Sequence, residues 1–200
     1  LDLKELVSLA HIRKATQGVV AVENCHPFHR DWQGRPWVFA HNGDIRTDIP
    51  SGDRYRPIGD TDSEAAFCRM LNQLSDRFAD TVDGHTLFPE LTAYSEHLAG
   101  HGIFNCLISN GDWLYAYCGT KLHTITRRAP FTSATLADDD VTVDFSAVTT
   151  VHDVVTIIST EPLTTDEHWQ PLQAGESLLF CDGDLIRRDR HAARPIPSPC

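Results

Sequence analysis

The chain has 200 residues, of which 41% are hydrophobic and 22% charged, a composition typical of a globular protein that buries one sizeable core. Its formal net charge of −11 argues against nucleic acid and anionic membrane surfaces as partners, because phosphate groups are recognised by clustered Lys and Arg. No apolar run is long enough to span a membrane and no signal peptide is evident, so we expect a cytoplasmic protein. The six cysteines include no CxxC pair, which favours reduced thiols.

Two apolar segments near the start of the chain are predicted to be buried strands. The first lies within residues 6–16, LVSLAHIRKAT, and the second is WVFAH at 37–41. The polar segment 17–36 between them is expected to be a long loop, and such loops are often functional. Asn42-Gly43 follows the second strand directly, and this pair taken alone is a turn signal because both residues tolerate positive φ.

Two helices are predicted next. Residues 61–64 form a capping box, and apolar side chains recur at spacings of three and four over residues 67–78. A second helix is expected from about Leu87 to Leu98, ended by Gly100.

The rest of the chain is rich in predicted strands. Hairpin turns are expected at Asn110-Gly111-Asp112 and at Asp182-Gly183, and a solvated turn at 138–140. The expected strands are IFNCLISN, WLYAYC, LHTITRR, VTVDF, VVTIIST and SLLFCDGDLIRR. Strands, two helices and more strands indicate a layered α+β domain. We expect a single domain over residues 1–190 and a loose Pro-rich tail at 191–200.

Three polar clusters fall at the ends of predicted elements: residues 13–18, Asn42-Gly43 and residues 60–64. Arg offers a planar fork to a carboxylate, Asp accepts hydrogen bonds from an ammonium group, and the donors of Asn-Gly can hold a developing oxyanion. These residue types together could bind an α-amino acid. The alternative is that they are unrelated polar residues scattered over the surface.

Four ordered segments, AHIRKATQG, ENCHPF, FAHNGD and TDSE, resemble the motifs of the class II glutamine amidotransferase domain. The later segments resemble that domain too, most closely its stand-alone YafJ-type members, so the resemblance spans nearly the whole chain. It implies a four-layer αββα sandwich of the N-terminal-nucleophile hydrolase type with mostly antiparallel sheets. The implied activity is hydrolysis of the glutamine side-chain amide to glutamate and ammonia through a γ-glutamyl thioester. L-Glutamine is then the expected substrate, the ammonia acceptor would be a partner protein or a small molecule, and no cofactor or metal is expected.

The resemblance also implies residues that bind glutamine. Arg13, helped by Thr16, would hold the α-carboxylate, and Asp62 would hold the α-ammonium group. Asn24 and His26 would shape the loop that encloses the substrate, although a histidine here is more often structural.

An oxyanion hole is implied at the end of the second strand. The side-chain amide of Asn42 and the backbone amide of Gly43 would stabilise the tetrahedral intermediate. Thr61 and Glu64 are interpreted as a helix cap only, and His41 as a residue that satisfies a buried partner.

The nucleophile of this family is a cysteine at the start of the mature chain, whose own α-amino group is the base. This sequence begins with Leu1 and lacks the segment that precedes the AHIR strand in family members. We therefore expect it to be the larger part of an enzyme and to be inactive alone.

Other interpretations stay open. The chain could be a non-catalytic glutamine or glutamate-binding module, or an N-terminal-nucleophile amidohydrolase for another γ-glutamyl amide. Cys25 beside His26, with His29 nearby, could be an internal nucleophile, although neighbouring residues seldom place their side chains in contact. A metal site built from His11, Cys25, His26, His29 and His41 matches no standard zinc spacing.

Overall fold

The computed structural model describes residues 7–12, 21–50, 52–139, 141–146 and 149–191. Its elements in chain order are η1 (Val22–Asn24), β1 (Phe28–Trp32), β2 (Arg35–Ile45), α1 (Asp62–Arg77), α2 (Gly84–Ala99), β3 (Gly102–Ser109), β4 (Leu114–Cys118), β5 (His123–Arg128), β6 (Ser133–Thr135), β7 (Thr142–Asp144), β8 (Val154–Ser159), β9 (Gln170–Pro171), β10 (Glu176–Cys181) and β11 (Asp184–Arg190).

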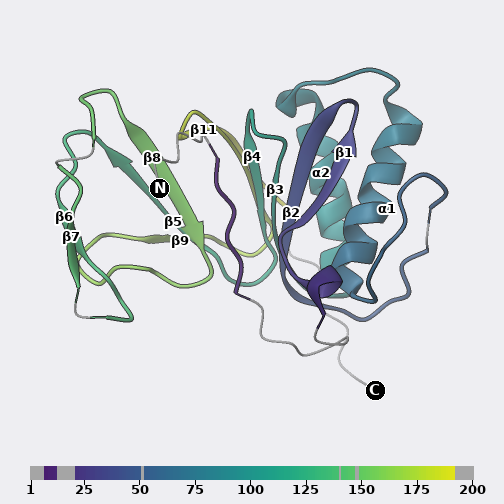
Figure 1. Cartoon of the computed structure of the whole chain (residues 1–200), viewed down its shortest axis with the longest axis horizontal. Helices are drawn as coiled ribbons and strands as arrows, with labels where there is room; N and C mark the ends of the chain where they lie inside the picture. The colour runs from purple at the N-terminus through teal and green to yellow at the C-terminus, as the bar shows by residue number, and fades with distance from the viewer. Residues whose placement is uncertain (1–6, 13–20, 51, 140, 147–148, 192–200) are drawn as a thin grey trace.

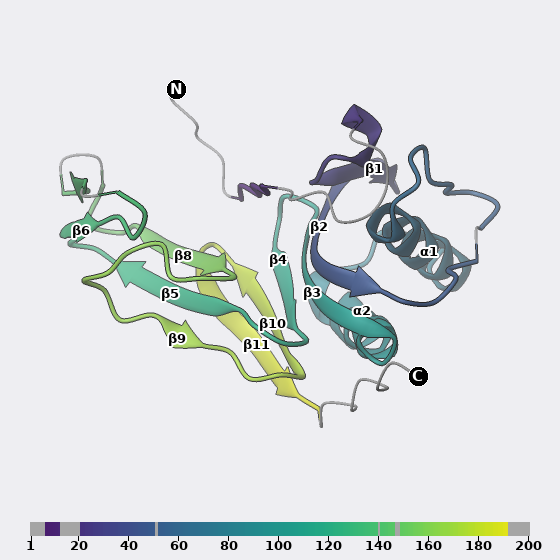
Figure 2. The ribbon, with the colours of Figure 1, turned by 90° about the horizontal axis from the view of Figure 1, so that it is seen from below.

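A six-stranded antiparallel sheet of order β1-β2-β3-β4-β10-β11 forms the centre of the fold. Both helices lie on one side of it, while the β8-β5-β9 sheet and the β6-β7 ribbon lie on the other (Figures 1 and 2). The α+β architecture with antiparallel sheets is therefore confirmed. The described residues supply one helical layer and two sheet layers of the expected sandwich.

The central sheet buries apolar side chains on both faces because its strands alternate with a period of two. Tyr115 and Leu179 belong to the large core under the helices. The neighbouring positions Leu178 and Phe180 join a smaller cluster on the opposite face, which Ile158 of β8 contacts. The second sheet is thus held against the first by a core of its own.

Local capping defines where the helices begin. Thr61 is the N-cap of α1, and its hydroxyl accepts a hydrogen bond from the Glu64 amide at 3.2 Å. Asp83 caps α2 in the same way through the Thr86 amide at 2.8 Å, which starts this helix three residues before the expected Leu87. Both predicted helices are confirmed.

The expected loop over residues 17–36 is wrong in its described part, because it contains η1, β1 and the start of β2. Gln33 and Gly34 have φ of 53° and 73° and connect the two strands as a two-residue hairpin turn. Phe28 and Trp32 face the core while the residues between them are polar, so the short strand was hidden by its charged residues.

Residues 7–12 form no strand, which corrects the first predicted strand over its described part, and Ile12 is fully exposed. Apolar alternation indicates which residues can be buried, but a strand also needs a neighbour that satisfies its backbone groups. Among the described strands it is β1 that pairs with the outer edge of β2.

The strands expected after α2 are confirmed as β3, β4, β5, β7, β8, β10 and β11, whereas the short strands β6 and β9 were not predicted. Residue 140 of the acidic turn and residues 192–200 of the expected tail lie outside the described residues. The boundary at residue 190 stays a prediction.

Neither described helix combines the length and the apolar character that crossing a bilayer requires. The five cysteines in the described part of the chain are free thiols.

Candidate functional site

Strand β2 does not end at Asn42-Gly43, which corrects the expected turn. It continues to Ile45, and Asn42 and Gly43 pair with Asn105 and Phe104 of β3. A Cβ atom at position 43 would lie 1.8 Å from the carbonyl oxygen of Ile103. Gly43 is therefore required by the close approach of β3 and not by a turn.

Within the described residues, the outer edge of β2 is open beside Gly43, because no strand pairs with it there. Among the described strands only β1 lies on that edge, and it pairs with β2 no further than Phe39. The carbonyl oxygen of Asn42 accepts a hydrogen bond from Nδ2 of Asn105 on β3, at 3.1 Å. Because C=O and N–H of a trans peptide point in opposite directions, the N–H of Gly43 is directed away from β3, toward the open edge.

Asp62 brings a carboxylate to the same edge. Its Oδ2 accepts from the backbone N–H of Ile45 at 2.8 Å, and its Oδ1 accepts from the N–H of Ser63 at 2.8 Å. Residues two apart in a strand direct their N–H groups to the same side, so Asp62 and the N–H of Gly43 lie roughly 7 Å apart along the strand. Oδ1 also lies 3.3 Å from the hydroxyl of Ser63, whereas Oδ2 keeps a lone pair that can accept from an ammonium group.

The side chain of Asn42 belongs to the opposite face of the sheet from His41, whose ring contacts α1. Asn42 lines a cavity of about 520 Å³ between the central sheet and β8. Apolar side chains dominate the lining, among them Ala40, Leu107 and Ile157, and Asn105 lies beside Asn42. The adjacent residues 42 and 43 thus present one amide donor to the cavity and another to the edge of the sheet.

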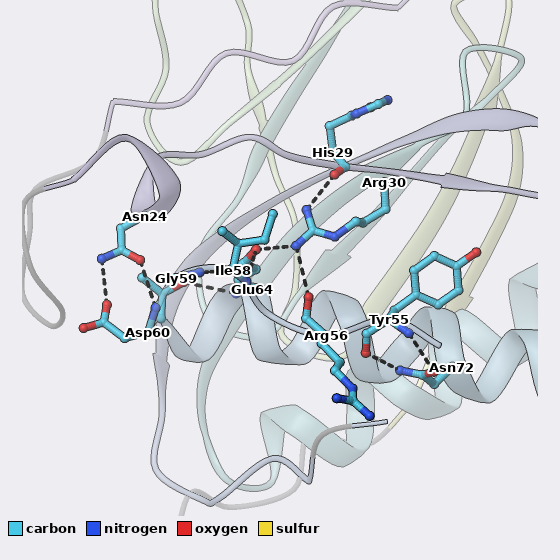
Figure 3. A network of polar contacts seen from close by, with 11 residues as sticks. Asn24, His29, Arg30, Tyr55, Arg56, Ile58, Gly59, Asp60, Glu64 and Asn72 are labelled. Atoms are coloured by element: carbon cyan, nitrogen blue, oxygen red, sulfur yellow. Dashed lines mark hydrogen bonds and ion pairs between the residues drawn. The ribbon is translucent and has the colours of Figure 1, made fainter. Parts of the chain in front are cut away.

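Glu64 fixes the loop that leads into α1, as Figure 3 shows. Its side chain is 1% exposed and accepts hydrogen bonds from the N–H groups of Ile58 at 3.0 Å and Gly59 at 2.7 Å. Arg30 of β1 forms an ion pair with the same carboxylate and donates to the carbonyl of Arg56. The interpretation of Glu64 as a helix cap only is therefore wrong.

Asn24 docks η1 onto the same loop. Its Nδ2 donates to Oδ1 of Asp60 at 2.6 Å, and its Oδ1 accepts from the N–H of Asp60 at 3.1 Å (Figure 3). The ring of His26 lies 4.3 Å from the ring of His11 and 4.6 Å from that of Phe28, between centroids. The segment before β1 is thus tied to the start of α1 near Asp62.

His41 is buried and satisfied, as expected. The carbonyl of Ile103 lies 3.1 Å from Nε2 and can only accept, so Nε2 carries the proton and Nδ1 accepts from the Ser63 hydroxyl at 2.8 Å. Desolvation by burial lowers the pKa of His41 below 6.5, with an opposing effect of the Ile103 hydrogen bond. His41 therefore acts as a neutral link between β2, β3 and α1.

The structure brings Asn42, Gly43 and Asp62 together at one end of β2, while Arg13 and Thr16 lie outside the described residues. Sequence reasoning missed Arg30 and Asn105. A signal for Asn105 exists, because it is a polar residue inside the apolar run IFNCLIS, and such buried amides are normally hydrogen-bonded.

The described contacts do not support an internal nucleophile. The thiol of Cys25 donates to the carbonyl of Ala21 at 3.5 Å, and Nε2 of His29 lies 3.7 Å from Asp31. Burial raises the pKa of Cys106 to about 12, which keeps its thiol protonated.

Among the described residues, no group of three or more His, Cys, Asp or Glu side chains is placed to hold a metal ion. The five residues considered for a metal site do not form one group. The rings of His11 and His26 lie 4.3 Å apart, but the ring nitrogens of His41 contact Ser63 and Ile103, and Cys25 and His29 contact Ala21 and Asp31.

Comparison with known proteins shows the family. Residues 1–197 match the model of the class-II glutamine amidotransferases, and the chain belongs to this family. It is 46% identical over 187 residues to the Escherichia coli K12 protein YafJ, which is named as a glutamine amidotransferase, covering 92% of this chain and 73% of YafJ. A Haemophilus influenzae protein, also named as a glutamine amidotransferase, is 44% identical over 186 residues, and the match covers 63% of its length. The chain thus spans about two thirds to three quarters of these relatives.

Solved structures agree with this assignment. A crystal structure from Pseudomonas aeruginosa PA01, described as a predicted glutamine amidotransferase, is 49% identical with a TM-score of 0.77, covering 83% of this chain and 66% of that one. The structure of the glutamine phosphoribosylpyrophosphate amidotransferase of Bacillus subtilis is 15% identical in sequence and superimposes with a TM-score of 0.51. The match covers 90% of this chain and 34% of that one, and at this identity it shows a similar fold alone. The fold is that of the N-terminal-nucleophile type of amidotransferase domain.

Proposed function

We propose that this chain is the main part of a glutaminase domain that hydrolyses the side-chain amide of L-glutamine to glutamate and ammonia. The observation that carries the proposal is the open edge of β2, where the N–H of Gly43 and the carboxylate of Asp62 face the same side. Family membership supports the choice of glutamine as the substrate.

Asp62 accepts hydrogen bonds from the α-ammonium group of glutamine in this proposal, and Arg13 with Thr16 binds the α-carboxylate. The fixed position of Asp62 between the amides of Ile45 and Ser63 supports its role, because an immobile acceptor loses little entropy on binding.

Asn42 and Gly43 stabilise the oxyanion of the tetrahedral intermediate. The N–H of Gly43 belongs to a paired strand and is preorganised, so it costs little reorganisation as charge develops on the amide oxygen, and the side-chain amide of the adjacent Asn42 is the second donor. Asn24 and His26 shape the loop beside the site, which the contact of Asn24 with Asp60 supports.

The nucleophile in this proposal is an N-terminal cysteine of the whole natural protein. Its thiolate attacks the side-chain carbonyl of glutamine, ammonia leaves with the proton taken up by the α-amino group, and water then hydrolyses the γ-glutamyl thioester to glutamate. The released ammonia goes to an acceptor on a partner protein or to a small-molecule amine acceptor.

The test is covalent labelling of the whole natural protein with a diazo-ketone analogue of glutamine, followed by intact-mass measurement and peptide mapping. We expect one adduct on an N-terminal cysteine and protection by glutamine. The Cys25→Ser variant is the control and should label as the unaltered protein does. A folded protein without an adduct would indicate a binding module, and an adduct that disappears in Cys25→Ser would indicate an internal nucleophile.

A further inference from the structure

The side chain of Asn105 connects the proposed oxyanion hole to the link between the two sheets. Asn105 is 2% exposed and lies opposite Asn42 in the β2–β3 pair. Its Nδ2 donates to the carbonyl of Asn42 at 3.1 Å and to the Thr120 hydroxyl at 2.9 Å. Its Oδ1 accepts from the N–H groups of Gly119, Thr120 and Lys121 at 3.0 to 3.1 Å. These three residues lead from β4 toward β5.

The carbonyl that Asn105 holds belongs to the same peptide unit as the N–H of Gly43. A peptide unit is planar, so a hydrogen bond that fixes its C=O also fixes the direction of its N–H. A donor on the carbonyl oxygen also polarises the N–H and makes it a stronger donor.

We propose that Asn105 is the positioning residue of the oxyanion hole: it anchors the Asn42–Gly43 peptide so that the Gly43 N–H points at the developing oxyanion. This inference rests on the proposed function. Asn105 touches neither substrate nor reacting atoms and acts only through the peptide it holds. A structural role limited to the segment 119–121 is the competing explanation.

The two halves of the Asn105 amide separate these explanations. Oδ1 holds the backbone of the segment 119–121, whereas Nδ2 holds the carbonyl of Asn42 and also donates to the Thr120 hydroxyl, which can itself donate to a carboxylate. The Asn105→Asp variant keeps the acceptor oxygen but replaces the donor with a second acceptor, which repels the carbonyl of Asn42. The segment should therefore stay in place while the peptide is released.

The experiment compares kcat and KM for glutamine hydrolysis by the whole natural protein with those of Asn105→Asp. The matched control is Asn72→Asp, because Asn72 is 6% exposed and its Oδ1 likewise accepts from two backbone amides, those of Arg54 and Tyr55. We expect kcat to fall about 10- to 100-fold in Asn105→Asp with KM nearly unchanged, and to stay near the original value in Asn72→Asp.

Asn42→Ala is measured in parallel so that the two proposals can fail separately. An unchanged kcat in Asn42→Ala would overturn the oxyanion hole itself. A reduced kcat in Asn42→Ala together with equal effects of Asn105→Asp and Asn72→Asp would overturn only the role of Asn105.

A second variant covers the case in which Asn105→Asp does not fold. Asn105→Ser shortens the side chain without adding charge, and the amide resonance of Gly43 is followed in protein labelled with ¹⁵N-glycine. We expect an upfield shift of the Gly43 amide proton, because its peptide carbonyl has lost a donor. An unchanged Gly43 resonance would overturn the inference.

Discussion

The buried His41 makes the stability of the domain depend on pH in the acid range. Because its pKa is lowered by burial, the unfolded chain binds a proton more readily than the folded one. The stability contributed by His41 is complete above the unfolded pKa of 6.5 and is lost as the pH falls through 6.5 toward the folded pKa.

We therefore expect urea unfolding to show a loss of stability between about pH 7 and about pH 5, and a smaller loss in His41→Gln. His152→Gln, at an exposed position, should keep the original pH dependence. Equal pH dependence of His41→Gln and the unaltered protein would contradict a depressed pKa at His41.

Asp62 combines a structural and a proposed binding role, which Asp62→Asn can separate. The amide keeps one acceptor oxygen for the backbone but removes the negative charge. A lost charge-assisted hydrogen bond of about 1.5–3 kcal/mol predicts a rise in KM for glutamine of roughly 10- to 100-fold, with kcat less affected.

Steady-state glutaminase kinetics of the whole protein provide the check, with Asp76→Asn at an exposed position of α1 as control. An unchanged KM would mean that Asp62 only fastens the start of α1 to the end of β2.

At the scale of elements, one carboxylate joins strand β1, helix α1 and the loop before α1. Glu64→Ala removes the partner of Arg30 and leaves two backbone amides without their acceptor. Breaking such a buried pair costs about 3 kcal/mol, and the loss should appear in the free energy of unfolding.

Glu64→Gln keeps the shape and one acceptor and should be less damaging. Glu161→Ala breaks the exposed ion pair with Lys121 and serves as the control without measurable loss. If the Glu64→Ala protein is as stable as this control, the contacts of Glu64 with Arg30, Ile58 and Gly59 in Figure 3 do not stabilise the fold.

The two helices could be predicted because their signals are local. Thr61 and the apolar positions of α1 fall within one window of sequence. The course of β2 through Asn42-Gly43 could not, because Gly43 is selected by the carbonyl of Ile103, which is 60 residues away and joins it only in the folded sheet. The same reason hid Asn105, whose partners lie on two other segments.

At the scale of the whole molecule, the family was predicted from four motifs in the right order, and the comparisons confirm it. The periodicity of apolar residues indicated an α+β architecture, but it could not predict that the second sheet packs against the first. The helix-side face and the cavity-side face of β2 are distinguished only by what packs on each, His41 against α1 and Asn42 near β8.

We propose that residues 42 and 43 form an oxyanion hole, and the kcat of Asn42→Ala is the sharpest test of this role. In the whole natural protein we expect kcat for glutamine hydrolysis to fall about 100- to 1,000-fold with little change in KM, because the lost donor acts as charge develops. Gln73→Ala removes a side-chain amide at an exposed position of α1 and should change neither constant. An Asn42→Ala enzyme with the kcat of Gln73→Ala would rule out Asn42 as an oxyanion donor.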